Sequence, residues 1–516
     1  MHRLDATRLK QLLKNRAATS AKFSAQTEQS TRYYNNENDI TTKNGGESKI
    51  DNHSADSDKG PLRRADYRVS SNFHQILVDQ KADYLTSQPP TIDTGDKGLN
   101  DQLQQMLGDN FAPTLQELCV DASNSGVAWL HIWEDVNDKS SHKLCYAAIP
   151  PEQVLPLYAG DTAHTLLGVC RKYAQIDPDT GKTYTCVEYW DDKTVTTYRT
   201  DRGDFEDLHM LQKYVLTDVS TDAVIGPTPT IQHHMGGVPF IPFRNGRYEK
   251  PDLPKYKGLI DVYDQVYNGF ANDLADVQQV ILVLSNYGGQ DLAQFWDNLR
   301  KDKAIKIDST MPDDKSGIDT LTIDIPVDAR EKMLDRTFDA VFVYGEGVNP
   351  KQLSNGTALS GVAIKLLYGQ LELKASTTET WFRQGVAAMV RMILAHMGVA
   401  DAATREIKQT WTRSLISNGS EQADIVAKLA AVSSKEAVAK NNPIVEDWQQ
   451  ELKDLKKDQD DADERAAAKP DPFANMAALQ QTGNQDDGSD NGDDDKSQPD
   501  GKKPDDKDKK PPLNDD

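Results

Sequence analysis

The sequence predicts an α+β protein, because it contains blocks with two different periodicities. Between residues 127 and 200, segments that alternate apolar and polar residues are separated by turn signals such as Asp177-Pro178, a pattern typical of antiparallel strands. Before and after this block, apolar residues recur at helical spacing. Consecutive strands flanked by helices indicate a meander-like sheet. We therefore expect an α+β domain over residues 67–250, followed by long helices.

The longest of these helices, predicted at residues 258–285, has two different faces. One face is apolar in steps of three and four, with Leu259, Tyr263, Val266, Phe270, Leu274 and Val277. The other carries short acids and amides, among them Asp261, Asp264, Asn268 and Asp276. Such a helix can pack on copies of itself and turn its acidic side toward a water-filled passage, as in a ring of identical subunits. An amphipathic helix in an ordinary core is the alternative, and periodicity alone favours it.

Composition excludes several classes of protein. With 516 residues, the chain is too long for one hydrophobic core, so several domains are expected. Its net charge of -22 argues against a general nucleic-acid-binding surface, which normally shows a basic face. The four cysteines are far apart and form no C-x-x-C pair, which favours reduced, structural thiols.

No targeting or membrane segment is expected. The N-terminal residues 1–16 are basic but contain no apolar run of the kind that a secretory signal needs. The longest uncharged apolar run, Val280 to Leu284, is too short to cross a bilayer. We expect a soluble protein or a component of a soluble assembly.

Further elements follow from periodicity and turn signals. Helices are expected at residues 4–16, 67–85, 99–107 and 112–124, with a loop or mobile arm at 35–59. After the long helix we expect a short helix at 291–299, a projecting hairpin of strands 304–308 and 320–326, and helices at 327–344 and 362–397. Gly398 is expected to cap the last of these. Residues 407–416 alternate again and could rejoin the first sheet. A helical segment at 425–455 is interrupted at Asn442-Pro443, and no packed structure is expected beyond 456.

The sequence contains fragments of catalytic and metal-binding motifs, but the residues around them do not complete any of these motifs. Gly345-Glu346-Gly347 is similar to part of a phosphate-binding turn, but no strand–glycine–helix unit surrounds it. His233-His234 lacks a second pair of metal ligands at useful spacing. No nucleophile signature is present, and the scattered acids nominate no acid–base pair. We expect no enzyme, no metal and no cofactor.

Two segments are better candidates for function. The loop 348–360 carries the flexible hydrogen-bonding side chains Lys351, Gln352, Ser354, Asn355 and Thr357 between two long helices. An ordinary helix–helix connection is an equally good interpretation. The hairpin tip 312–317 presents Asp313, Asp314 and Lys315, either as a docking knob or as a solvated turn.

Three motifs in order then resemble a known family. The family has a tyrosine pair followed by a polar turn and Asp-Ile, and residues 32–40 (RYYNNENDI) resemble this motif. It also has an Asn-Phe, Val-Asp-x-Lys and Tyr-Leu-x-x-x-Pro signature, which residues 71–92 (SNFHQILVDQKADYLTSQPPTI) resemble. VEDWQQEL (445–452) resembles its closing helix. The family is the Siphovirus-type portal proteins, the head–tail connector rings of tailed phages of Gram-positive bacteria. The chain departs from it with an Asn after the tyrosine pair and with Ser87, where glycines are usual.

The resemblance implies a portal fold built from named parts. These are an N-terminal helix and arm (1–60), an α/β wing (61–257) with a long helix and returning strand (361–417), a stem of two helices (258–285 and 327–344), a clip containing a small β-hairpin (286–326), a tunnel loop (345–360), a helical crown (418–455) and a disordered acidic tail (456–516). The stem acids would line the channel, the stem apolar stripe would pack subunits together, the loop would face DNA, and the clip tip would dock the terminase or a connector.

The resemblance also implies function and partners. About twelve copies would close into a ring at one capsid vertex, through which double-stranded DNA is packaged and ejected. The partners would be the terminase large subunit, the major capsid and scaffold proteins and a head-completion adaptor, with no sequence specificity for DNA and no membrane. The ring would belong to the virion and assemble in the host cytoplasm. A minor head or adaptor protein is the alternative, and a soluble hydrolase with paired carboxylates is a weaker one.

Overall fold

The computed structural model confirms the mixed α+β class. It describes residues 5–42, 65–134, 144–217, 224–277, 281–285, 317–321, 326–353, 361–413, 427–428, 430, 433–440, 442, 445 and 448–467. The chain divides into a large unit, residues 1–418, and a small one, residues 419–516.

The strands of the large unit form the predicted antiparallel meander. The main sheet has the order β11-β7-β6-β5-β4, with β8 paired to β7, and consists of β4 (Val154–Tyr158), β5 (Leu166–Ile176), β6 (Thr183–Trp190), β7 (Thr194–Thr200), β8 (His209–Met210) and β11 (Thr230–Gln232). A second sheet has the order β12-β2-β3, from Phe240–Arg244, Val127–Glu134 and Leu144–Ile149. Strands β9 (Tyr214–Thr217) and β10 (Val224–Thr228) form a separate hairpin.

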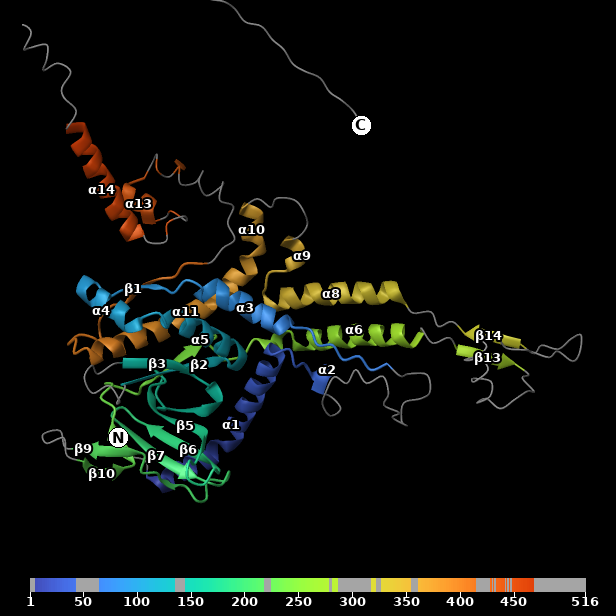
Figure 1. Cartoon of the computed structure of the whole chain (residues 1–516), viewed down its shortest axis with the longest axis horizontal. Helices are drawn as coiled ribbons and strands as arrows, with labels where there is room; N and C mark the ends of the chain where they lie inside the picture. Colours follow the sequence, from blue (N-terminus) through green and yellow to red (C-terminus); the bar gives the residue numbers. More distant parts are fainter. Residues whose placement is uncertain are drawn as a thin grey trace, which may run out of the picture. The chain divides into compact units, whose positions relative to one another are not determined.

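Helices cover the second sheet and form the largest core. They are α3 (Phe73–Thr86), α4 (Lys97–Leu107), α5 (Phe111–Ser125) and the long α11 (Gly369–His396) (Figure 1). Helices α4 and α5 lie close to their predicted bounds, but the predicted helix 67–85 begins only at Phe73, and residues 67–72 are not helical. Phe382 of α11 is fully buried against Phe243 of β12, with ring centroids 5.2 Å apart. A Cβ on Gly385 would lie 2.8 Å from the Phe243 ring, so only glycine lets α11 approach the sheet this closely.

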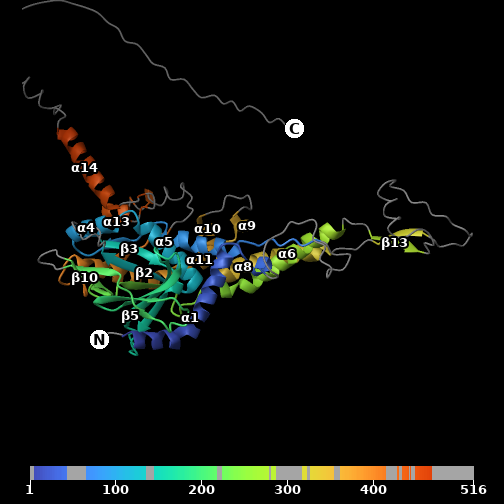
Figure 2. The ribbon, with the colours of Figure 1, turned by 60° about the horizontal axis from the view of Figure 1, so that its bottom comes forward.

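The first helix is much longer than predicted. Helix α1 runs from Ala6 to Tyr34, whereas periodicity indicated only residues 4–16. Its N-terminal half packs Leu9 and Leu13 on the main sheet beside Tyr198, and Figure 2 shows it along that sheet. The second half is mostly polar, so its amphipathic signal is weak, but it is stabilised by contacts with α5 and α3. Part of the segment predicted as a mobile arm is also ordered, as the short helix α2 (Asp39–Thr42).

Two further boundaries differ from the prediction. Helix α6 spans Lys257–Val277, and residues 281–285 form strand β13, which pairs with β14 (Gly317–Leu321). The run Ile281–Leu284 is apolar throughout, and periodicity cannot distinguish helix from strand in so short a run. The predicted helix 362–397 is divided at Tyr368 into α10 (Gly361–Leu367) and α11. The predicted hairpin strand 304–308 lies outside the described residues.

The end of α11 agrees with its predicted cap, but the strand after it has a different partner. Gly398 has a φ of +79° and donates to Ala395, so it ends the helix in the left-handed conformation that glycine tolerates. The strand predicted at 407–416 is the short β15 (Lys408–Thr410), which pairs with β1 (Thr91–Asp93) and not with the first sheet. Its pairing partner is more than 300 residues away in sequence, which local pattern cannot reveal.

In the small unit, α13 (Lys435–Lys440) contacts α14 (Trp448–Ala467), with the Lys440 ammonium 5.8 Å from the Trp448 ring centroid. The two helices flank Asn442-Pro443, where the break was predicted. Helix α14 continues beyond residue 456 to Ala467, so the predicted start of the disordered tail at residue 456 is wrong. Within the described residues, no helix is both long and apolar enough to span a membrane.

Candidate functional site: the α6–α8 helix pair and its loop

Helix α6 forms an antiparallel pair with α8 (Val327–Gly345), and both ribbon views show the two side by side (Figures 1 and 2). At one end of the pair, Arg330 of α8 binds Asp273 of α6 at 2.5 Å. At the other end, Tyr263 of α6 and Phe338 of α8 both contact the ring of Phe73 on α3, with centroids 5.0 and 5.4 Å away. The pair is thus attached to the α/β part of the large unit at its Phe73 end.

Most of the described apolar stripe of α6 packs within the protomer. Leu259 and Tyr263 pack against a buried cluster that includes Phe73 and Phe342. The Phe270 ring lies 5.5 Å from the Arg330 guanidinium, and Val266 is half-buried. Of the predicted subunit-packing residues, Leu274 is 46% exposed and so is available to another copy. The side chain of Val277 lies outside the described residues.

The acidic strip of α6 is largely covered by a segment that we call the strap, residues 65–71. Asn268 accepts from Val69 N at 2.6 Å and donates to Val69 O at 2.7 Å. Asn272 accepts from Tyr67 N at 2.6 Å, and Asp264 accepts from Ser71 N at 3.1 Å. Four residues of an α-helix span about 6 Å along its axis, and two residues of an extended segment span about 6.6 Å. Polar side chains spaced four residues apart on α6 therefore lie opposite every second residue of the strap.

This covering corrects the predicted channel lining. Asp264 and Asn268 are 1% and 3% exposed, so in the protomer they hold the strap and do not face water. Asp264 also accepts from Asn38 Nδ2 at 2.7 Å, and burial raises the pKa of its carboxyl group. The sequence pattern identified a polar face correctly, but it contained no sign of a segment from nearly 200 residues earlier covering it.

Asp261 joins the tyrosine-pair motif to the start of α6. It accepts a hydrogen bond from the Tyr33 hydroxyl and binds Lys257 Nζ at 2.7 Å. Lys257 also binds Asp39 at 2.8 Å, and Asp39 binds Arg32 at 3.1 Å. Burial, followed by the Asp261 hydrogen bond, raises the pKa of the Tyr33 hydroxyl. The motif at 32–40 therefore has a structural role in fastening α1 and α2 to α6. The side chain of Asp276 lies outside the described residues.

Exposed acids occur instead on α8, where the sequence analysis did not look for them. Asp328, Glu331, Asp335 and Asp339 are exposed and recur in steps of three and four along one side of the helix. Lys332 and Arg336 are exposed beside them. The same spacing argument that was applied to α6 would have found this acidic stripe, because the signal is equally visible in the sequence.

The described start of the predicted tunnel loop folds back on α8. Lys351 Nζ binds Asp335 at 2.8 Å and lies 4.3 Å from the Phe338 ring centroid. Gln352 is exposed. Asn349 caps the short helix α9 (Pro350–Leu353) by accepting from Lys351 N at 2.9 Å. The other loop residues, Ser354, Asn355 and Thr357, and the predicted docking residues, Asp313, Asp314 and Lys315, lie outside the described residues.

The Gly345-Glu346-Gly347 motif is a packing motif. A Cβ on Gly345 would lie 2.5 Å from Leu77 of α3, and a Cβ on Gly347 would lie 2.3 Å from the same side chain. The glycines thus allow α8 to end directly against α3. The helix that follows, α9, has only four residues, and Asn349 already accepts from its Lys351 N–H.

A buried charged cluster, which we call the Asp252 node, lies beside this motif. Lys81 Nζ and Lys374 Nζ bind the Asp252 carboxylate at 2.7 and 3.3 Å, and all three side chains are at most 5% exposed. Burial alone would raise the pKa of Asp252, but the two lysines hold it well below its usual range. Sequence reasoning missed this node, because its members come from α3, α11 and the segment before α6.

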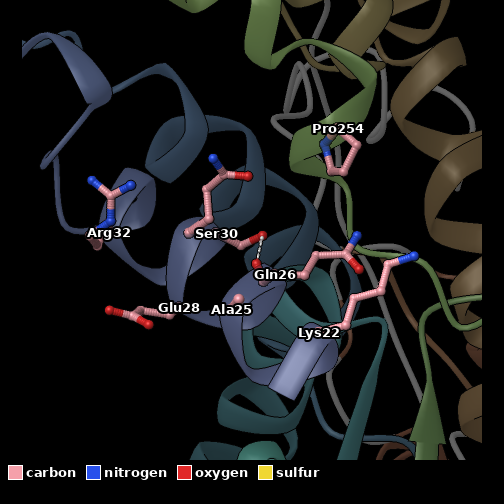
Figure 3. Close-up of a pocket in the computed structure, with 8 residues that line it drawn as sticks. Lys22, Ala25, Gln26, Glu28, Ser30, Arg32 and Pro254 are labelled. Carbon is pink, nitrogen blue, oxygen red and sulfur yellow. Dashed lines mark hydrogen bonds between the residues drawn. The ribbon is translucent and has the colours of Figure 1, made fainter. Parts of the chain in front are cut away.

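The remaining candidates do not form a reactive site. His233 Nε2 donates to Asp191 O at 3.0 Å, and its Nδ1 accepts from Met235 N at 3.3 Å. No group of metal-binding side chains occurs in the part of the chain that the structure describes. A hollow of about 700 Å³ is lined by Lys22, Ala25, Gln26, Glu28, Gln29, Ser30, Arg32 and Pro254. In Figure 3, Lys22 and Glu28 point to different sides, and Ser30 donates to the Gln26 carbonyl at 3.1 Å. The described residues of this hollow present no paired catalytic groups.

Comparison with known proteins agrees with the resemblance. Residues 18–465 match the family model described as "Phage portal protein, SPP1 Gp6-like". A "Portal protein" of Clostridium phage phiCD119 is 36% identical over 85% of this chain and 94% of its own length. A "Portal protein" of Bacillus phage SPP1 is 29% identical over 82% of this chain and 81% of its own. A solved structure titled "Neck of empty GTA particle computed with C6 symmetry" aligns with a TM-score of 0.39 and 11% identity, over 71% of this chain and 88% of that chain.

Proposed function

Because the chain belongs to the SPP1-type family of phage portal proteins, and is therefore a portal component of the virion, we propose that it works as a ring of about twelve copies at one capsid vertex. The ring is the passage for double-stranded DNA during packaging and ejection. The observation that carries this proposal is the match over residues 18–465, which includes both helices of the α6–α8 pair.

In this proposal the large unit supplies the wing, with α11 as its long helix, and the α6–α8 pair supplies the stem. Residues 286–326 form the clip, 345–360 the tunnel loop and 418–455 the crown. The clip tip at Asp313, Asp314 and Lys315 docks the terminase large subunit and, later, a head-completion adaptor. Scaffold and major capsid proteins contact the outside of the ring, which assembles in the host cytoplasm.

A passage for DNA must avoid holding it. Each phosphate that a lysine or arginine neutralises adds affinity regardless of base sequence, so a cationic wall would retain the duplex. The exposed acids Asp328, Glu331 and Asp335 on α8 support a wall that repels the backbone, and they replace Asp264 and Asn268 in that role. Cations such as Lys351 on the loop make transient contacts. The protein hydrolyses nothing in this scheme, since the packaging motor supplies the work.

Exposed apolar side chains on α6 support a contact between copies. Leu274 of the stripe is 46% exposed, and Tyr267, which lies outside the stripe, is 44% exposed. A closed ring needs two different patches on each protomer, because neighbouring copies meet head to tail. Leu274→Asp is expected to yield monomers or rings of irregular size, which native mass spectrometry would resolve.

The test of the proposal combines imaging with charge reversal. Negative-stain microscopy of the purified chain should show rings with a central hole, and isolated protomers under assembly conditions would contradict it. In phage assembly, the double variant Asp328→Lys and Glu331→Lys should shorten the packaged DNA, because it adds cations to the wall. Asp401→Lys, on an acid with a 55% exposed side chain away from the pair, is the matched control. Equal packaged length in both variants would remove α8 from the wall.

A further inference from the structure

The beginning of the loop is held more firmly than its glycine-rich sequence suggests. Helix α8 ends at Gly345. Residues 345–349, which we call the loop root, include three buried residues, Gly345, Val348 and Asn349. Val348 is 4% exposed and packs in a cluster with Tyr84 and Leu371. Asn349 is 7% exposed and donates to Asp339 Oδ1 at 2.8 Å. The root is therefore a packed part of the protomer.

Gln80 of α3 pairs with the backbone of the root as a neighbouring strand would. Val348 N donates to Gln80 Oε1 at 2.9 Å, and Gln80 Nε2 donates to Val348 O at 3.0 Å. One side-chain amide thus satisfies both backbone groups of one root residue. Since a shift by a single residue would break both bonds, the pair fixes the register of the root against α3.

Lys374 of α11 holds the other side of the root. Its ammonium donates to Gly345 O at 2.8 Å while binding Asp252 at 3.3 Å. The Asp252 node contains two lysines and one carboxylate, so one positive charge is left over. The C-terminal end of a helix carries about half a negative charge. The C-terminal end of α8 therefore partly compensates the buried Lys374 ammonium. Moving the end of α8 away would leave this ammonium poorly compensated, which is costly in a buried site.

The contacts with the root come from α3, which precedes the loop in sequence, and from α11, which follows it. Gln80 lies long before it and Lys374 follows it, and both helices belong to the main helical core. Lys255 adds an ion pair with Glu346 at 3.0 Å. The root therefore follows the position of α3 and α11.

We propose that Gln80 and Lys374 are positioning residues, which fix the root of the loop on α3 and α11 and so set where the following DNA-facing side chains begin. The inference rests on the proposed function for the meaning of that position, but the contacts themselves can be tested without DNA.

The first experiment measures the root directly in the full-length assembled chain. Gln80→Leu removes both amide bonds at similar size, and Gln80→Glu replaces the donor toward Val348 O by an acceptor. Hydrogen exchange at residues 346–349 should become at least tenfold faster in either variant. The matched control is Gln116→Leu, because Gln116 also bonds α3, to Asp83 at 2.6 Å, away from the loop. Exchange at the root within twofold of wild type in both Gln80 variants would overturn the proposal.

A spectroscopic signal separates positioning from general stability. A spin label at Gln352→Cys, in a background with the partly exposed Cys145 changed to Ser, should show a larger mobile fraction in Gln80→Leu and in Lys374→Met. Lys374→Met leaves Asp252 and Lys81 as a one-to-one pair, so the fold is retained. An unchanged label spectrum in both variants would also overturn the proposal.

Packaged DNA length in unlabelled Gln80→Leu phage supplies the separate functional readout. A severalfold loss with intact rings is the expected result, and Gln116→Leu should package normally. If the root is mobilised but packaging is unchanged, the positioning role is supported and the place of the loop in the channel is contradicted. The two failures are thus distinguishable.

Discussion

Helices α6 and α8 carry similar sets of short acids, yet the two sets have opposite surroundings. On α6, Asp264 is 1% exposed and holds the strap and Asn38. On α8, the side chain of Asp335 is 71% exposed and its bond is an ion pair with Lys351. The helices lie side by side, so neither their position nor their composition explains the difference.

The difference arises from what covers each helix. The strap presents backbone N–H groups every second residue, and the polar steps of α6 satisfy them, so those acids and amides stabilise the fold. On α8, within the described residues, Asp335 and Asp339 bind only the side chains of Lys351 and Asn349 from the start of the loop, and all four acids of the stripe remain exposed. An acidic face is therefore evidence of a polar contact, and only the tertiary structure says whether water, backbone or another molecule makes it.

The largest effect is expected at the most buried carboxylate. Asp252→Ala should lower the free energy of unfolding by about 3–5 kcal/mol, because it leaves two lysines buried without their counter-charge. Urea denaturation would measure it. The control is Asp401→Ala, because the Asp401 side chain is 55% exposed and its ion pair with Arg405 is screened by water, so stability should change far less. Equal losses in both variants would refute the distinction between buried and exposed acids.

The strap provides the next test. Asn268→Ala removes both hydrogen bonds to Val69 and should cost about 2 kcal/mol, since two backbone groups lose their partners. Hydrogen exchange should accelerate at residues 67–71 before it does so elsewhere. Gln265→Ala, at an exposed position on the same helix, is the control. If the two variants exchange alike, the strap is not held by the polar ladder.

A partly buried acid on α5 should also make the stability depend on pH. Burial, then the charges of Glu117 and Glu152, raise the pKa of Asp121 on α5 to about 7. The folded state then binds more protons than the unfolded state between about pH 4 and pH 7, so stability falls as pH rises through that range. Asp121→Asn should remove the fall, worth about 1–2 kcal/mol after allowance for solvent screening. Parallel stability–pH curves for wild type and variant would contradict the assignment.

The smallest effect on stability is expected at the exposed ion pair between α8 and the start of the loop. Lys351→Ala and Asp335→Ala should each change the free energy of unfolding by less than about 1 kcal/mol, because their ion pair is exposed. Packaged DNA length is the informative readout for Lys351→Ala, which should reduce it if the loop contacts DNA. A normal yield of filled heads would remove Lys351 from the mechanism.

The fold was predictable where the signal was local and periodic. Strand alternation gave the meander, and helical spacing gave α5 and α8 nearly to the residue, whereas α3 begins six residues later than the predicted helix 67–85. Prediction failed where distant contacts decide: the second half of α1, the β13 strand and the pairing of β15 with β1. At the candidate site, the sequence identified the polar face of α6 but not its cover, and it missed the acids of α8 although their spacing was visible.

By itself, the sequence determined the α+β class, the two long amphipathic helices and, through three ordered motifs, the family. These follow from short-range spacing, which the chain carries whether or not it is folded. Only the tertiary structure decided that Asp264 and Asn268 serve the strap, that the Gly345–Gly347 segment packs on Leu77, and that Gln80 and Lys374 hold the loop root. The physical reason is that burial and pairing depend on which distant segments meet, and neighbouring residues in sequence carry no record of that.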